Sequence, residues 1–410
     1  MKQLSEELGH QEYSALQALF SMTTPTRIGL ADSLGLSLLK TSSILTELEK
    51  HEFIIKAGKL QNKTGRPSII YNLNASRFYS LGVSVDSSSL RIIAVDASKA
   101  IIHKEQIPLE EANDPHHYVD ILVEQLDTSI TRVLSNFKNQ GKCICSITLA
   151  LAGITDEERG IWLLGLQVGG VRDIPLAEIM QDRLGVPVFI EDKARLLAFY
   201  ENTNGHGKEV ENFVLLYIGL GLGAGIVIGN KLYRGEQGIS GEIGHIAHGN
   251  NNYRCSCGNV GCLETVVSKP GIIRVIRERL HEGVISSLQE YTKPGAPELT
   301  IEAILEAANN GDRLAQSTLF DIGEFIGDAC SIIIKLFNPS KVIISGYGAV
   351  FKEFFREPVN QVISRKVIPI MTEKYETVYV DYSPYDEAYG AALFALYRYF
   401  GMKVKLLKQQ

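Results

Sequence analysis

The sequence lacks any apolar run that approaches the roughly 20 residues needed to cross a membrane. Its longest apolar stretches, such as SIIIKLF, are far shorter, and its first residues, MKQLSEELGHQEYSALQ, lack the apolar centre of a signal peptide. Cysteine is also scarce, because six cysteines in 410 residues do not make a disulfide framework. We therefore expect no membrane insertion and a cytoplasmic protein with reduced thiols.

A strongly basic composition is absent as well. The formal net charge is -6, so any attraction to nucleic acid or anionic lipid must come from a local patch. Hydrophobic residues make up 45% and charged residues 21%, which is ordinary for a soluble globular protein. A chain of 410 residues is longer than one hydrophobic core usually accommodates, so we expect about two or three domains.

Residues 1–75 have the outline of a winged helix-turn-helix. Helical spacing over 11–22 is followed by a short helix over 24–34, a turn, and a second helix that begins after the N-cap residue Ser37. Two apolar runs around a basic Gly-Pro turn then predict a hairpin, the wing. From Ser37 to Ile70 there are six basic and three acidic residues, a local excess of positive charge.

This unit predicts binding to double-stranded DNA, with the second helix in the major groove. Leu38, Ile44, Leu45 and Leu48 are assigned to its buried side, and the exposed early residues and the wing are assigned to DNA. An arginine at the wing tip suits a minor groove, whose negative potential attracts it. The alternative is a protein-docking module whose charges are only solvated. The predicted DNA contacts are Lys40, Thr41, Ser42, Ser43, Lys63 and Arg66.

Beyond about Tyr79 the chain alternates strands and helices, which predicts an α/β body. Within it, Cys255, Cys257 and Cys262 form a C-x-C-x4-C pattern, and His245 lies ten residues before the first cysteine. Three thiolates and one imidazole fill the tetrahedral shell of a structural zinc ion and leave no place for a catalytic water. His248 is a rival fourth ligand, and free thiols in a turn are the alternative to a metal site.

The stretch GEIGHIAHGNNNYRCSCGNVGCLE, which follows GLGLGAGIVIGNKLYRG, resembles the ROK family of sugar kinases and sugar-responsive repressors, from about Leu81 onward. The resemblance implies that His245 and the three cysteines hold zinc, and that the fold is an actin-like, two-lobed one. Family repressors also carry a winged helix with Gly-Arg-Pro in the wing, here residues 65–67. The implied domains are 1–75 for DNA, 76–195 with 380–410 for a smaller lobe, and 196–379 for a larger lobe with the zinc site.

Compared with the kinases of the family, the sequence predicts a degenerate kinase fold that does not transfer a phosphoryl group. In the Asp-x-Gly-Gly-Thr loop that wraps ATP phosphates, Ser84 stands at the aspartate and Asp86 at a glycine, where a carboxylate repels nucleotide. Leu220 stands where kinases place a phosphate-binding threonine. An ungapped alignment puts Lys193 at the catalytic aspartate, whereas a one-residue slip puts Asp192 there. The alternative function is an ATP-dependent sugar kinase with an added DNA module.

The same resemblance implies a sugar site at Glu242, His245 and Glu264, with Asp192 or Lys193 beside it. Carboxylate and imidazole groups suit the paired hydroxyls of a pyranose, although both glutamates could instead only brace the zinc loop. The effector is expected to be a sugar or a sugar 6-phosphate facing Lys193, or else a sugar-transport protein. We thus expect a regulator, most simply a repressor, that binds a palindromic operator as a homodimer or homotetramer.

Overall fold

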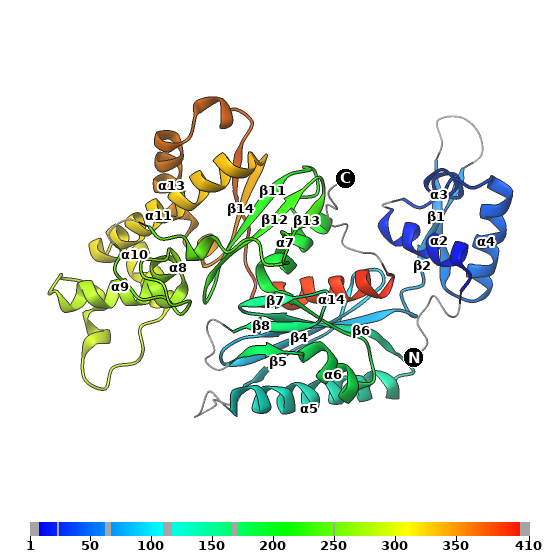
Figure 1. Ribbon diagram of the computed structural model, residues 1–410, viewed down its shortest axis with the longest axis horizontal. Coiled ribbons are helices and arrows are strands. Elements are labelled where there is room, and N and C mark those ends of the chain that lie inside the picture. Colours follow the sequence, from blue (N-terminus) through cyan, green and yellow to red (C-terminus); the bar gives the residue numbers. More distant parts are fainter. Residues whose placement is uncertain are drawn as a thin grey trace.

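The computed structural model describes residues 8–22, 24–61, 67–109, 117–165, 171–248 and 251–401. The N-terminal domain is a bundle of three helices with a two-stranded hairpin (Figure 1). Its elements are α2 (His10–Ser21), α3 (Arg27–Leu34), α4 (Leu38–Lys50), β1 (Ile54–Leu60) and β2 (Ser68–Leu73). This is the winged helix-turn-helix expected from the sequence. The wing residues Lys63 and Arg66 lie outside the described residues.

The turn between α3 and α4 is three residues long, and Ser37 caps α4 by accepting a hydrogen bond from the amide of Lys40 at 3.3 Å. Ile44, Leu45 and Leu48 are buried as expected. Thr41 was expected to be exposed but is fully buried, because the helical period of 3.6 residues places it on the same side as these three. Leu38 was expected to be buried but is 46% exposed.

The rest of the chain contains two five-stranded sheets of the same topology. Each consists of an antiparallel three-stranded meander extended by two parallel strands on the side of its first strand. The first sheet, in order, is β10 (Val188–Asp192), β6 (Ile144–Leu151), β3 (Tyr79–Val85), β4 (Ser89–Asp96) and β5 (Ile101–Pro108). The second is β13 (Lys231–Tyr233), β12 (Leu222–Ile228), β11 (Phe213–Ile218), β14 (Lys341–Gly346) and β15 (Glu376–Tyr379).

Helices cover both sheets and connect them (Figure 1). α5 (Tyr118–Asn139) and α6 (Leu176–Leu184) pack on one face of the first sheet, and α14 (Asp386–Tyr399) packs on its other face. α7 (Lys193–Asn204) follows the first sheet but packs on the second, while α14 follows the second sheet but packs on the first. This exchange ties the two halves of the molecule together.

A small sheet of three short strands extends the first sheet. The second sheet carries a larger set of helices. These helices are α8 (Glu264–Val267), α9 (Lys269–His281), α10 (Ile301–Asn309), α11 (Arg313–Phe337), α12 (Tyr347–Val350) and α13 (Lys352–Lys366), with 3-10 turns at Ile243–His245, Ser287–Thr292 and Pro369–Met371. The small sheet contains β7 (Ile154–Asp156), β8 (Ile161–Leu164) and β9 (Arg172–Ile174). In the described part of the chain, no helix has the length and apolarity that crossing a bilayer requires.

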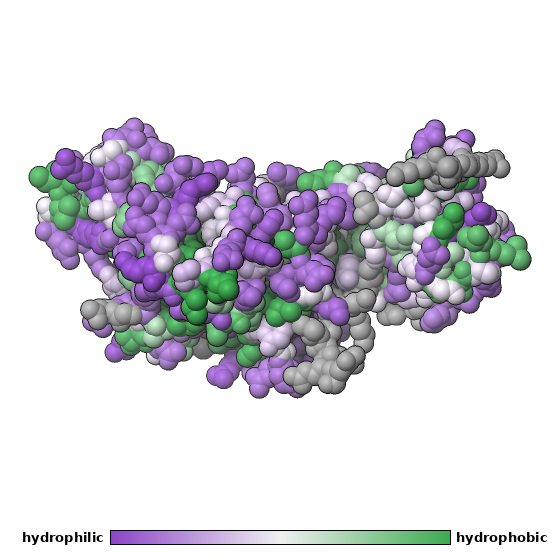
Figure 2. Space-filling view, turned by 90° about the horizontal axis from the view of Figure 1, so that it is seen from above, coloured by the Kyte–Doolittle hydropathy of each residue, from purple (hydrophilic) through white to green (hydrophobic). Residues whose placement is uncertain are grey.

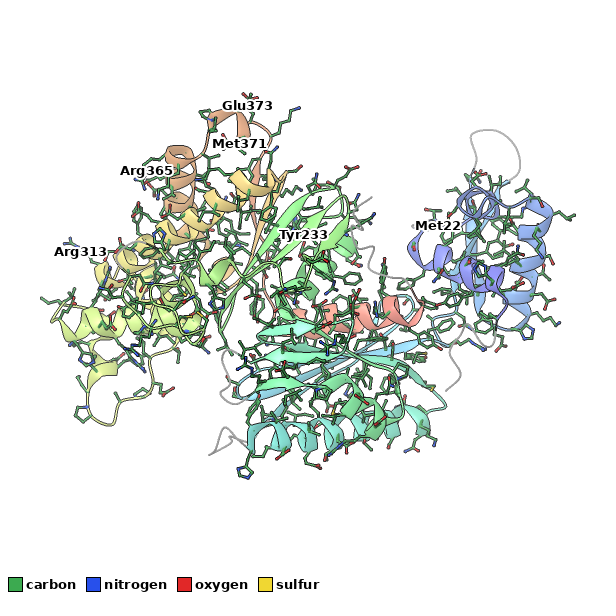
Figure 3. The ribbon with its side chains drawn as sticks, viewed as in Figure 1. Met22, Tyr233, Arg313, Arg365, Met371 and Glu373 are labelled. Atoms are coloured by element: carbon green, nitrogen blue, oxygen red, sulfur yellow. The ribbon has the colours of Figure 1, made fainter. Side chains whose placement is uncertain are left out.

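The N-terminal domain is joined to the α/β body by aromatic packing at the end of α14. The ring of Phe400 lies 4.9 Å from that of Phe20 and 5.1 Å from that of Phe78, centroid to centroid. The side-chain amide of Gln17 donates to the carbonyl of Phe400 at 2.7 Å. Met22, which follows α2, packs into the same cluster on the side that faces the body (Figure 3).

The contact between β3 and α14 depends on Gly82. A Cβ atom at this position would lie 2.0 Å from the carbonyl oxygen of Ala388 and 2.3 Å from the amide nitrogen of Ala392. Gly82→Ala should therefore lower the free energy of unfolding by about 3 kcal/mol, the upper end of the usual overpacking cost. The matched control is Gly223→Ala, whose Cβ would meet the Ala194 methyl at 3.3 Å. Equal denaturation midpoints for both variants would contradict this account of the packing.

Candidate ligand and metal sites

A cavity of about 60 Å³ lies between the two sheets. All five residues expected at the sugar site line it: Asp192, Lys193, Glu242, His245 and Glu264. The turn between β11 and β12 and the start of β12 form one wall. A second, larger cavity of about 380 Å³ adjoins the first and shares Asp86, Ala152, Leu220 and Glu264 with it. The mixed polar and apolar lining of the two cavities is that of a small-molecule site.

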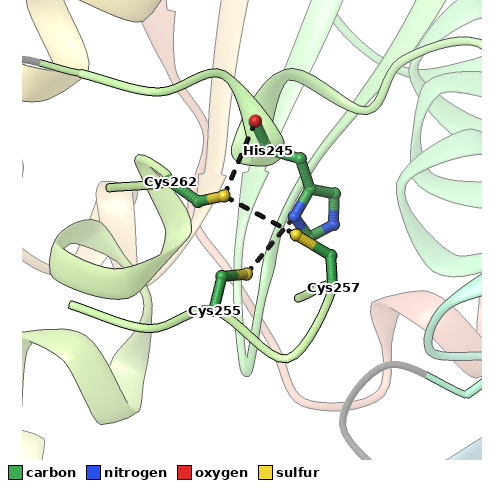
Figure 4. Close-up of side chains that lie close together, drawn as sticks. All are labelled: His245, Cys255, Cys257 and Cys262. Atoms are coloured by element: carbon green, nitrogen blue, oxygen red, sulfur yellow. Dashed lines mark hydrogen bonds between the residues drawn. The ribbon is translucent and has the colours of Figure 1, made fainter. Parts of the chain in front are cut away.

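The three cysteines and His245 come together beside this cavity (Figure 4). One potential ligand atom from each lies within 4.8 Å of all the others. Cys255 Sγ lies 3.5 Å from His245 Nδ1, and Cys257 Sγ lies 3.7 Å from Cys262 Sγ. A zinc tetrahedron with Zn–S near 2.3 Å and Zn–N near 2.0 Å has edges of about 3.5 Å and 3.8 Å for these pairs. The donor set and its spacing therefore fit zinc.

The structure distinguishes His245 from His248 as the histidine that lies in the cysteine cluster. His248 Nε2 is 3.0 Å from a carboxylate oxygen of Asp328, so this histidine is engaged elsewhere. Gly258 and Gly261 adopt φ values of 96° and 82°, a backbone region that favours glycine. These two residues let the chain turn sharply enough to bring three closely spaced thiols to one point.

Glu264 and Glu242 connect the cysteine cluster to the cavity. One carboxylate oxygen of Glu264 accepts from the amide of Leu222 at 3.1 Å, and the other lies 3.8 Å from Cys255 Sγ. Glu242 Oε2 lies 3.7 Å from Nε2 of His245, the nitrogen that does not face the thiols. Burial, with Asp192 nearby, raises the pKa of Glu242 to about 7. Bracing the loop and lining the cavity are thus compatible roles for the same two carboxylates.

A buried arginine holds the loop that presents Glu242. Arg195 donates from Nε to Glu191 at 2.9 Å and from Nη1 to the carbonyl of Gly238 at 2.8 Å. Glu191 is fully buried and also pairs with Arg234. Because a buried carboxylate is stable only with such partners, the strand β10, the helix α7 and the loop after β13 are held in one arrangement.

Lys193 does not stand free in the cavity. It is 4% exposed, and its Nζ lies 2.9 Å from Glu387 Oε2 and 3.2 Å from Asp86 Oδ1. Arg91 pairs with the other oxygen of Asp86 at 2.6 Å. Burial opposes ionisation of Asp86, but Lys193 and Arg91 outweigh it and hold its pKa below the usual value. Two cations and two carboxylates therefore neutralise one another where the family kinases are expected to cradle phosphate.

Three hydroxyl groups complete this charge cluster. Ser84 and Tyr217 donate to Glu387, and Tyr382 donates to it at 3.2 Å. Burial, followed by the charge of Glu387, raises the pKa of both tyrosines well above 10, so both remain protonated donors. Glu387, Tyr217 and Tyr382 were not predicted from the sequence, because they lie on separate elements and share no local spacing pattern.

Four of the six predicted DNA contacts lie among the described residues, and these four differ in exposure. Lys40 and Ser43 are exposed on α4. Ser42 is half-buried and accepts a hydrogen bond from Arg27 at 3.1 Å. Thr41 is buried and donates its hydroxyl hydrogen to the carbonyl of Ser37 at 3.0 Å, so its assignment to DNA is wrong. The assignments of the other described residues stay predictions.

A known family model matches the α/β body, and known regulators match most of the chain. The family model described as ROK family matches residues 80–397. The xylose repressor of Caldicellulosiruptor bescii is 28% identical over 341 residues, which is 83% of this chain and 84% of that protein. The transcriptional dual regulator NagC of Escherichia coli is 28% identical over 323 residues, 78% of this chain and 76% of its own.

Solved structures of a regulator and of a kinase are also similar to this chain. A ROK family transcriptional regulator described as a homologue of the E. coli MLC protein has a TM-score of 0.79 and 28% identity, and the match covers 96% of this chain and 97% of that one. A ROK family glucokinase from Streptomyces griseus, solved with glucose and AMPPNP, has a TM-score of 0.65 and 23% identity and covers 78% of this chain. The regulator therefore matches almost the whole chain, and the kinase confirms the fold of the body.

Cys257→Ala should abolish metal binding, because it removes one of four ligands. We expect about one zinc ion per wild-type chain and nearly none in the variant, measured by atomic emission after exhaustive dialysis. The variant should also unfold at a lower temperature, since metal binding contributes to folding. Cys143→Ala, which changes an exposed cysteine outside the cluster, is the control and should keep its zinc. Equal zinc content in all three proteins would contradict the site.

Lys193→Met should destabilise the protein by roughly 3 kcal/mol, because it leaves Glu387 buried without its cation. Chemical denaturation followed by circular dichroism measures the loss. The double variant Lys193→Met/Glu387→Gln removes both charges and should recover much of it. If the double variant is no more stable than the single one, the ion pair does not account for the effect.

Proposed function

The chain belongs to the ROK family, and we propose that within it this protein is a DNA-binding transcriptional repressor that responds to a sugar, not a sugar kinase. The observation that carries the proposal is the winged helix-turn-helix joined to a body whose phosphate-binding region holds its own ion pairs. Relatives named as xylose and N-acetylglucosamine repressors support the same function.

The charge cluster argues against phosphoryl transfer from ATP. Asp86 occupies the position of a glycine in the expected phosphate loop, and its carboxylate carries negative charge into the interior. Lys193 is already paired with two carboxylates and is not free to meet a γ-phosphate. A nucleotide would have to break these buried pairs before binding, which costs several kcal/mol per uncompensated charge. The protein is thus a degenerate kinase fold.

We assign the effector to the cavity lined by Glu242, His245 and Glu264. Carboxylates accept hydrogen bonds from neighbouring sugar hydroxyls, and small-molecule sites carry a few such convergent polar groups. A neutral sugar is favoured over its 6-phosphate, because the charge of Lys193 is already compensated. Zinc held by His245 and the cysteines would fix the wall of this cavity without taking part in chemistry.

We assign the separate roles to domains with the boundaries expected from the sequence. Residues 1–75 bind operator DNA in the cytoplasm, while 76–195 with 380–410 and 196–379 form the two lobes around the effector. α14 begins at the charge cluster with Glu387 and ends at the aromatic contact with the N-terminal domain. Effector binding that moves α14 would thus shift the recognition helices of a homodimer or homotetramer on a palindromic operator.

Operator release by a sugar is the test of this function. Operators are selected from random duplex DNA with the purified full-length protein, and binding should weaken steeply with salt as phosphate contacts are lost. One sugar from a panel of hexoses, pentoses and hexosamines should reduce the affinity at least tenfold. Glu242→Gln should keep operator binding but lose the sugar response. Release only by a sugar-transport protein, with no sugar active, would contradict a direct sugar effector.

Kinase activity is measured in the same preparation. ADP formation from ATP with every sugar of the panel should stay at the level without sugar. Sugar-dependent ADP release that Asp192→Asn abolishes would instead establish the alternative, a sugar kinase with a DNA module.

A further inference from the structure

Leu39 is the most exposed large hydrophobic side chain among the described residues of the N-terminal domain, with 84% of its surface in contact with solvent. It is the second residue of α4, the helix expected in the major groove. Figure 1 shows α4 on the side of this domain that faces away from the lobes, and Figure 2 shows hydrophobic side chains at that outer end. Packing within the domain therefore does not account for this leucine.

The position of Leu39 distinguishes it from a surface leucine of no consequence. Ile44, Leu45 and Leu48 define the buried side of α4, and a rotation of about 100° per residue places Leu39 on the opposite side. The exposed residues that share its outward side are Ser43, Thr46 and, at the end of the helix, Lys50, all of them polar. The first turns of a recognition helix are the part that reaches base edges.

The charges around Leu39 fit a polyanion. Residues 38–46 of α4 contain Lys40 and no acidic residue. Lys40 has no acidic partner among the residues that the structure describes, and the N-terminus of the helix adds partial positive charge. The acidic residues of α4 lie further along, where Glu47 pairs with Lys50 at 3.5 Å and Glu49 pairs with Lys56 at 2.7 Å. An exposed leucine beside a lysine and a helix N-terminus suits an apolar feature of DNA better than a protein core.

In the major groove, the thymine C5 methyl is the apolar group that base pairs present. We propose that Leu39 determines part of the operator sequence by packing against the methyl group of a thymine in each half-site. The proposal rests on the DNA-binding function proposed above and adds to it a chemical preference, thymine over cytosine at one position. Leu39 was not among the DNA contacts predicted from the sequence, all of which are polar side chains.

Uracil substitution tests the contact by removing one methyl group and nothing else. Each thymine of a selected operator is replaced in turn by deoxyuridine, and dissociation constants are measured by fluorescence anisotropy. At one position in each half-site the wild-type protein should lose about fourfold in affinity, the factor expected for burial of one methyl-sized group. Leu39→Ala should bind the thymine operator more weakly and show no difference between thymine and uracil at that position.

Ile285→Ala is the matched control, since Ile285 is 94% exposed but lies in the α/β body. This variant should keep the wild-type difference between thymine and uracil. A difference that persists in Leu39→Ala overturns the inference and leaves the function intact. Failure of the wild-type protein to bind any duplex overturns the function itself. A change of oligomeric mass in Leu39→Ala would also overturn the inference, because the leucine would then contact another protein chain.

Discussion

The ion pair between Lys193 and Glu387 is the interaction on which the arrangement of the two halves depends. Neither charge is stable in the interior alone, so each fixes the element that carries the other. Lys193 begins α7, which packs on the second sheet, and Glu387 lies in the first turn of α14, which packs on the first. The cavity between the sheets lies beside this crossing, where a ligand can act on both halves at once.

α14 extends the influence of this pair to the N-terminal domain. Its first turn carries Glu387, and its last residues lead into Phe400, which packs against Phe20 and Phe78. A helix of 14 residues is a rigid connection over about 20 Å. The side chains that hold its two ends are different in kind, charged at the end beside the cavity and aromatic at the end beside the N-terminal domain.

Local patterns predicted much of this fold and of the cluster of His245 with three cysteines. Ser37 as a cap, the short turn before α4 and the cysteine spacing each lie within a few residues, so their geometry follows from backbone rules. The buried Thr41 and the exposed Leu38 show where such reasoning failed. Residue type suggested a polar surface and an apolar core, but the helical period decided which side each residue faced.

The sequence alone determined the α/β class, the winged helix and the four metal-ligand candidates, because these depend on periodicity and short spacing. Only the tertiary structure decided that Lys193 is neutralised by Asp86 and Glu387, residues 107 and 194 positions away along the chain. It also separated His245 from His248, since Asp328 engages the second histidine from a distant helix. Charges far apart in sequence meet only when the sheets and helices that carry them have packed.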